Sequence, residues 1–121
     1  MQKVLTSVPD DRLRAYIIWL PMLPGDSRSW AKSRSDEFSD TRLSYYWDGN
    51  RLTGQQWQKV LGTNRTAWDV YLLYGAASQW DEEPATPNFW MHQLGGVSTA
   101  SRLDEATFEA RVKELLGQAK R

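Results

Sequence analysis

The chain has 121 residues, and its 15 Lys and Arg balance its 15 Asp and Glu, so the formal net charge is zero. A chain of this size is expected to form one domain, residues 1–121, and it lacks the basic excess with which proteins bind nucleic acid or an anionic membrane. No stretch approaches the about 18 consecutive apolar residues of a membrane span, and the first residues lack the apolar segment of a secretory signal. We therefore expect a soluble, cytoplasmic protein with neither a nucleic-acid nor a membrane partner.

The composition lacks cysteine and is rich in tryptophan. Without Cys the chain has no disulfide, no thiolate nucleophile and no Cys-ligated zinc. Seven Trp in so short a chain predict an aromatic core whose indole N–H groups find partners. Core packing is the simplest explanation of these rings, and a ring-lined ligand pocket or a dimer interface is the alternative.

Taken in order, the chain begins with a short helix, a strand and a second helix. Residues 1–8 place apolar side chains at helical spacing, and residues 15–20 form a continuous apolar run typical of a strand buried on both faces. Asp26 or Ser27 can then cap a helix that runs to about Phe38.

A second strand and two further helices have clear signals. Leu43–Trp47 is the next strand, and Thr53 with Gln56 fits a capping box that opens a short helix, closed by Gly62 at its C-terminal end. The last helix opens within residues 101–104 and places Phe108 and Val112 on its apolar face.

A β-hairpin precedes that last helix. Residues 68–75 and 88–94 are its predicted strands, and both faces of the first are mostly apolar, which indicates cover on two sides. A symmetric connection would place Asp69 opposite His92. The aromatic residues of the hairpin are expected to supply a contact surface or a pocket.

The predicted order is therefore (α)-β-α-β-α-β-β-α, an α/β fold with one mixed sheet and helices packed over it. This order resembles the thioredoxin-like fold from the end of that fold's first helix onward. The resemblance to a group of bacterial thioredoxin-like proteins covers about residues 4–94, and four motifs carry it: Tyr-Ile-Ile-Trp-Leu-Pro-Met-Leu-Pro from Tyr16, Tyr-Trp-Asp ending at Asp48, Trp-Asp-Val-Tyr-Leu-Leu-Tyr from Trp68, and Phe-Trp-Met-His-Gln-Leu from Phe89.

Two departures from the family limit what the resemblance implies. The family's opening strand and its Cys-x-x-Cys are expected upstream of Met1, so the fold is read as N-terminally truncated. Thr66-Ala67-Trp68 stands where the family has a Pro before the hairpin. Because thiol–disulfide exchange requires an attacking thiolate, a chain without Cys is not a thiol–disulfide oxidoreductase, and no cofactor is expected.

The missing strand also predicts a partner. An unpaired edge in a buried sheet is costly, so either the sheet is rearranged or a second copy of the chain covers the edge in a homodimer. The small, Cys-free chain also fits the product of a bacterial mobile gene cassette.

In a thioredoxin-like topology, one end of the sheet gathers the candidate ligand-binding residues. These are Asp48, Trp68, Asp69, Trp90 and His92. One His and two Asp could bind a metal, or Asp69 and His92 could form an acid/base pair. The alternative is structural, in which Asp69 caps a turn and His92 is a hydrogen-bonded ring. A single His makes a structural zinc site unexpected, and neither a metal nor a catalytic residue is assigned.

No Gly-x-Ser-x-Gly elbow and no phosphate-binding Gly-rich loop follows a predicted strand. The function expected from the sequence is a non-catalytic thioredoxin-like binding or interaction module, acting as a homodimer with a possible small-molecule ligand. The alternative is a small-molecule- or metal-binding enzyme that uses Asp69 and His92. A third reading is a truncated relic that folds only as a dimer.

Overall fold

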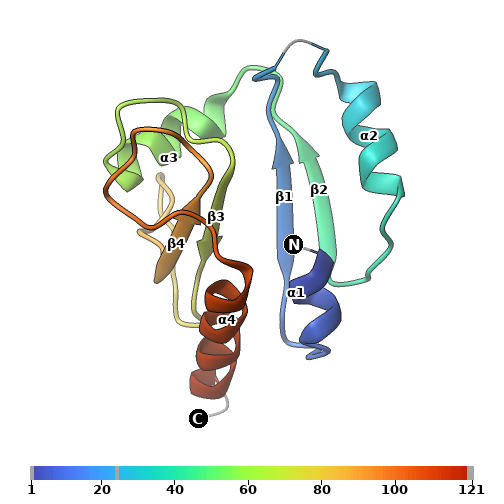
Figure 1. Ribbon diagram of the computed structural model, residues 1–121, viewed down its shortest axis with the longest axis vertical. Coiled ribbons are helices and arrows are strands. Elements are labelled where there is room, and N and C mark those ends of the chain that lie inside the picture. The colour runs from blue at the N-terminus through green and yellow to red at the C-terminus, as the bar shows by residue number, and fades with distance from the viewer. Residues whose placement is uncertain (1, 24, 120–121) are drawn as a thin grey trace.

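The computed structural model describes residues 2–23 and 25–119 and has a mixed α/β architecture (Figure 1). Its elements in chain order are α1 (Gln2–Ser7), β1 (Ala15–Trp19), α2 (Arg28–Asp36), β2 (Leu43–Trp47), α3 (Leu52–Leu61), β3 (Val70–Leu73), β4 (Phe89–His92) and α4 (Glu105–Ala119). The predicted succession of helices and strands is confirmed. Met1, in the predicted first helix, and Pro24, in the first motif of the resemblance, lie outside the described residues.

The four strands form two sheets, whereas one mixed sheet was predicted. β1 and β2 pair in parallel, and β3 and β4 pair as an antiparallel hairpin. No ladder joins β1 to β3 in the described part of the chain, so the hairpin is not part of the β1–β2 sheet. Side chains connect the two sheets instead: Ile18 of β1 packs against the cluster that α3 forms with the hairpin. The apolar pattern of a strand reveals which faces are buried but not which strand is its neighbour.

The hairpin is covered on both faces, as predicted for it. Val70, Leu72 and Trp90 pack on one face against α3. The other face packs against α1 and α4, and its hairpin residues are Tyr71, Leu73, Phe89 and Met91. These rings are partly buried by the packing on both faces, and the contact surface or pocket predicted for the hairpin stays a prediction.

The β1–β2 sheet has one covered face and one partly open face. α2 covers the first, where Trp19 Nε1 donates a hydrogen bond of 2.9 Å to Ser35 Oγ. On the other face, Tyr16 is 64% exposed and Tyr46 is 54% exposed. The predicted burial of residues 15–20 on both faces is therefore wrong, because a run of apolar residues and Tyr can also leave one face to water or to a partner.

Arg42 joins α1 to the start of β2. Its guanidinium donates hydrogen bonds to the carbonyl oxygens of Leu5 (2.7 Å), Val8 (2.6 Å) and Asp10 (3.2 Å). It also forms two bonds, of 3.0 and 2.7 Å, with the carboxylate of Asp40. The carbonyls at the end of a helix have no partner within it, so Arg42 satisfies groups that α1 leaves unpaired.

The Arg42 pair predicts how stability responds to acid. Hydrogen bonds from Arg42 lower the pKa of Asp40 from 3.8 to about 2. A carboxyl whose pKa is lower in the folded state stabilises the fold above its unfolded pKa, and this contribution is lost as the pH falls from 3.8 toward about 2. We expect Asp40→Asn to lower the urea midpoint at neutral pH and to flatten its fall over that acid range.

Asp36→Asn is the matched control, because Asp36 forms an exposed ion pair with Lys32 at 3.3 Å. Exposed pairs of this kind contribute little to stability. If the urea midpoint of Asp40→Asn falls in acid as steeply as those of the wild type and of Asp36→Asn, the acid response does not come from the Arg42–Asp40 pair.

α3 passes close to the segment that leads into β3, and Gly54 allows it. A Cβ at Gly54 would lie 2.5 Å from Thr66 Cγ2 and 2.7 Å from Leu20 Cδ2. The helix ends as predicted at Gly62, whose φ of 68° is left-handed.

Two Gly→Ala substitutions should therefore have opposite effects. Gly54→Ala is expected to lower the free energy of unfolding by about 1–3 kcal/mol through overpacking. Gly117→Ala in α4, where a new Cβ meets nothing within 4 Å, should raise it by roughly 0.5–1 kcal/mol through helix propensity. Urea denaturation measures both, and an equal gain from both substitutions would refute the close approach at Gly54.

Candidate functional site

The register of the hairpin separates Asp69 from His92. Val70 lies opposite His92, and the carbonyl of Asp69 accepts a hydrogen bond of 3.0 Å from the backbone N–H of Gln93. The predicted pairing of Asp69 with His92 is wrong by one residue, which places their side chains on opposite faces. The cause is local: Asp69 has a φ of 55°, so the extended conformation starts only after it.

His92 is a fully engaged core residue. It is 1% exposed; its Nδ1 accepts a hydrogen bond of 3.0 Å from the Leu94 N–H, and its Nε2 lies 2.9 Å from the carbonyl oxygen of Ala100. This arrangement assigns the neutral tautomer with the proton on Nε2. Its backbone bonds to Ser101 and Leu103 add to the connection between β4 and the segment before α4. Neither ring nitrogen is open to a metal or a substrate.

Asp69 contacts a buried phenol. Its Oδ1 lies 3.1 Å from the hydroxyl of Tyr71, which is also 2.9 Å from Oε1 of Gln93. Burial raises the pKa of Tyr71 to about 12, and the charge and hydrogen bond of Asp69 add to the increase. Tyr71 is thus a protonated donor at neutral pH, and the group holds the open end of the hairpin together.

Asp48 caps α3. Its carboxylate accepts hydrogen bonds from the backbone N–H groups of Leu52 (3.0 Å) and Thr53 (2.7 Å), and from the Thr53 hydroxyl (2.5 Å). Partial burial raises the pKa of Asp48, but these bonds outweigh it and the net shift is downward. The predicted capping box of Thr53 and Gln56 is wrong, since Thr53 lies inside the helix and the cap comes from the end of β2.

The two predicted Trp residues differ in their surroundings. Trp90 is half-buried against α3, with its ring centre 5.8 Å from that of His92. Trp68 is half-buried and makes no hydrogen bond or ring contact with another described residue. Of the five predicted residues, the structure thus brings Trp90 and His92 together, while Asp48 and Asp69 have other partners. The described residues contain no group of three or more His, Asp or Glu side chains that could hold a metal ion.

A cluster of three aromatic residues, Trp57, Tyr74 and Trp80, was not predicted from the sequence. Trp57 Nε1 donates to the hydroxyl of Tyr74 (3.0 Å), which donates to the carbonyl of Ala85 (2.5 Å). Trp80, 53% exposed, packs edge-on against both rings at 5.5 and 5.2 Å. The group anchors the connection between β3 and β4, and its only sequence signal was the abundance of Trp.

The exposed surface with the clearest chemistry is the open face of the β1–β2 sheet. Tyr16 and Tyr46 share this face with Ile18 and Ser44, and their ring centres are 6.4 Å apart. Two adjacent exposed aromatic rings on a sheet are a feature of contact surfaces, and the alternation of residues along the two strands places them together.

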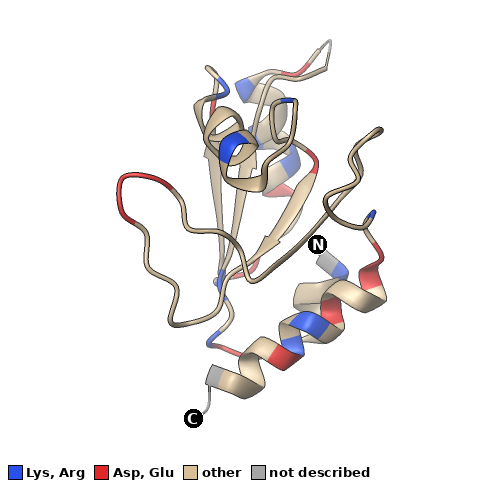
Figure 2. Cartoon of the chain, turned by 90° about the vertical axis from the view of Figure 1, so that its left-hand side faces the viewer, with Lys and Arg blue, Asp and Glu red and all other residues tan. Residues whose placement is uncertain are grey.

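Charge marks no comparable surface. Figure 2 shows residues of both signs along α4 and an acidic stretch, residues 81–83, at the tip of one loop. No helix within residues 2–23 and 25–119 is long and apolar enough to cross a membrane. No protein-family model matches the chain, and no curated protein or solved structure does so either. The inference of function therefore rests on the chemistry of the described residues.

The structural role of His92 is testable. His92→Ala leaves a buried N–H and a buried carbonyl without their partners, so the free energy of unfolding should fall by roughly 3 kcal/mol in urea denaturation. Asp69→Asn keeps a short polar side chain that tolerates a positive φ, so its effect should stay within about 0.5 kcal/mol. A melting temperature that Zn²⁺ raises in the wild type but not in His92→Ala would instead assign a metal to this residue.

Proposed function

We propose that the chain is a non-catalytic interaction module of thioredoxin-like fold that forms a homodimer through the open face of its β1–β2 sheet. The observation that carries the proposal is the exposed pair of Tyr16 and Tyr46 on that face. Parallel sheets are ordinarily covered on both faces. The α3 cluster covers Ile18 on this face, and a partner that covers the two rings would complete the layer.

The succession of elements supports the fold assignment. A parallel β1–α2–β2 unit is followed by α3, the antiparallel hairpin and α4. The thioredoxin-like fold has its elements in this same order after its first helix. Thiol–disulfide exchange is outside the chemistry of this chain because it has no Cys.

The contacts of the polar candidates support a non-catalytic role. Asp48 caps a helix, Asp69 binds Tyr71, and His92 uses both ring nitrogens inside the core. An enzyme built on Asp69 and His92 would need these two groups to share a substrate, and the register places them on opposite faces.

A second copy is the partner that best fits this surface. A two-fold dimer brings the same patch of both copies together, so the patch has to be compatible with itself. The open part of this face carries no charge: it consists of Tyr16 and Tyr46 with Ser44 beside them, while Ile18 of the same face packs against the α3 cluster. Since the net charge of the chain is zero, two copies do not repel each other at long range, and Tyr is enriched at interface cores.

Light scattering on the purified chain tests this proposal. We expect a mass of twice the 14.0 kDa of one chain, and a mass of one chain for the double variant Tyr16→Ser/Tyr46→Ser. Far-UV circular dichroism of the variant should stay unchanged, because both side chains are exposed.

Leu52→Ser is the matched control, since Leu52 is 58% exposed and belongs to α3 rather than to β1 or β2. It should remain dimeric. A wild-type monomer would overturn the proposal, and so would a double variant that stays dimeric.

A further inference from the structure

We infer a second site, which binds a small aromatic carboxylic acid in a cavity between α1, α2 and the β1–β2 sheet. The cavity has a volume of about 140 Å³ and lies on the sheet face that carries Ile17 and Tyr45, opposite the Tyr16–Tyr46 pair. It is independent of the proposed dimer. Its apolar lining consists of Leu5, Ile17, Trp19, Phe38, Leu43 and Tyr45.

The interior presents aromatic surface and no open polar group. The indole N–H of Trp19 is used by Ser35 Oγ at 2.9 Å, and the hydroxyl of Tyr45 donates to the carbonyl of Phe38 at 3.2 Å. An apolar cavity of roughly 150 Å³ stays dry and takes up a benzene-sized molecule. The interior therefore suits a six-membered aromatic ring.

The rim adds a cation with unused donors. Arg34 borders the cavity, lies 5.8 Å from the ring centre of Trp30, and forms an ion pair of 3.4 Å with Glu37. Its guanidinium makes no hydrogen bond to another described residue, although it carries five N–H donors in a geometry that matches a carboxylate. A ring in the cavity that carries a carboxylate at its open end would bring that group to Arg34.

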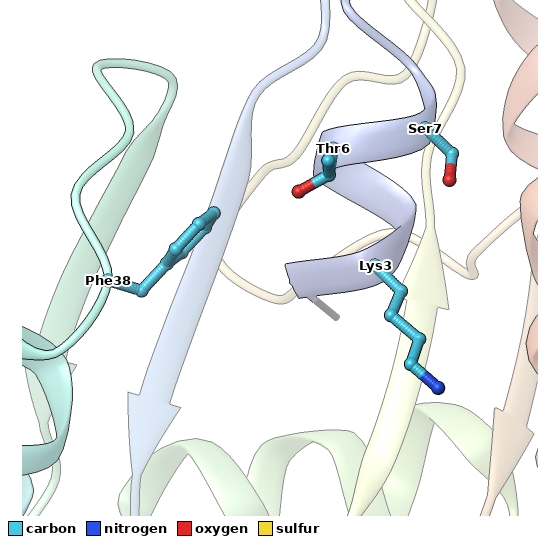
Figure 3. A pocket seen from close by; sticks show the side chains of 4 residues that line it. All are labelled: Lys3, Thr6, Ser7 and Phe38. Carbon is cyan, nitrogen blue, oxygen red and sulfur yellow. The ribbon is translucent and has the colours of Figure 1, made fainter.

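A larger hollow lies beside the cavity. It has a volume of about 370 Å³ and shares Phe38 with the inner cavity. Figure 3 shows the Phe38 ring pointing toward α1, with the Thr6 hydroxyl turned toward it. Lys3 and Ser7 line the hollow as well, and Lys3 is 83% exposed, with an ion pair to Glu105 at 3.7 Å. This hollow thus adds a second cation and hydroxyls to the surface around Phe38, which also favours an anionic group there.

Glu37 provides a second test of the site, because its carboxylate borders the cavity and already forms an ion pair with Arg34. A carboxylate ligand has to compete with Glu37 for the guanidinium. Removing the charge of Glu37 should therefore strengthen binding of an acid, and removing that of Arg34 should weaken it.

The test is a titration of the full chain with phenylacetate and, separately, with its uncharged analogue 2-phenylethanol, followed by ¹H–¹⁵N NMR. Saturable shifts are expected at the amides of Ile17, Leu43 and Tyr45. Arg34→Gln should weaken phenylacetate about three- to tenfold and leave 2-phenylethanol unchanged, and Glu37→Gln should tighten phenylacetate by a similar factor.

Arg111→Gln is the matched control, because Arg111 pairs with Glu114 at the same spacing on α4, at 3.0 Å. It should leave both affinities unchanged. The inference is overturned if phenylacetate gives no saturable shift, if the shifts fall on the Tyr16–Tyr46 face, or if Arg34→Gln weakens both molecules equally. Both rim variants change exposed side chains, so the outcome does not depend on a disturbed core.

Discussion

The two halves of this molecule depend on how Arg42 holds α1. The helix has six residues, too few to be stable alone, and its end is fixed by bonds from one guanidinium that is itself paired with Asp40. Once fixed, α1 serves both sheets, because Val4 and Val8 pack with the hairpin and α4 while Leu5 lines the cavity beside β1 and β2. A single side chain therefore positions the core of one half and the wall of a cavity in the other.

Much of the fold could be predicted because each element is defined locally. Ser27 accepts the N–H of Trp30 at the start of α2, and Gly62 ends α3 in the left-handed conformation, as their residue types indicated. Strand pairing was less predictable, since β1 and β3 meet through side chains such as Ile18 rather than through a ladder. Apolar alternation describes a face of a strand and contains no information about the partner edge.

The predicted pairing of Asp69 with His92 was wrong because one backbone angle, the φ of Asp69, determines the register of the hairpin. The positive φ of Asp69 delays the start of β3, so Val70 takes the place opposite His92. Asp adopts a positive φ more readily than most residues, but it also occurs in extended chain, so its residue type does not decide between the two. The exposure of Tyr16 could not be predicted either, because Tyr suits both a core and a contact surface.

The open face and the cavity belong to the same two strands, and the alternation of side chains keeps them apart. Successive side chains of a strand point to opposite faces, so Tyr16 and Ile17 are neighbours in β1 that belong to different surfaces. No described side chain that lines the cavity belongs to the open face. Where two binding events are coupled, each changes the affinity of the other by the same factor. Two ligands that contact no common side chain have no direct contact through which to couple, so an acid in the cavity and a second copy on the open face are expected to bind independently.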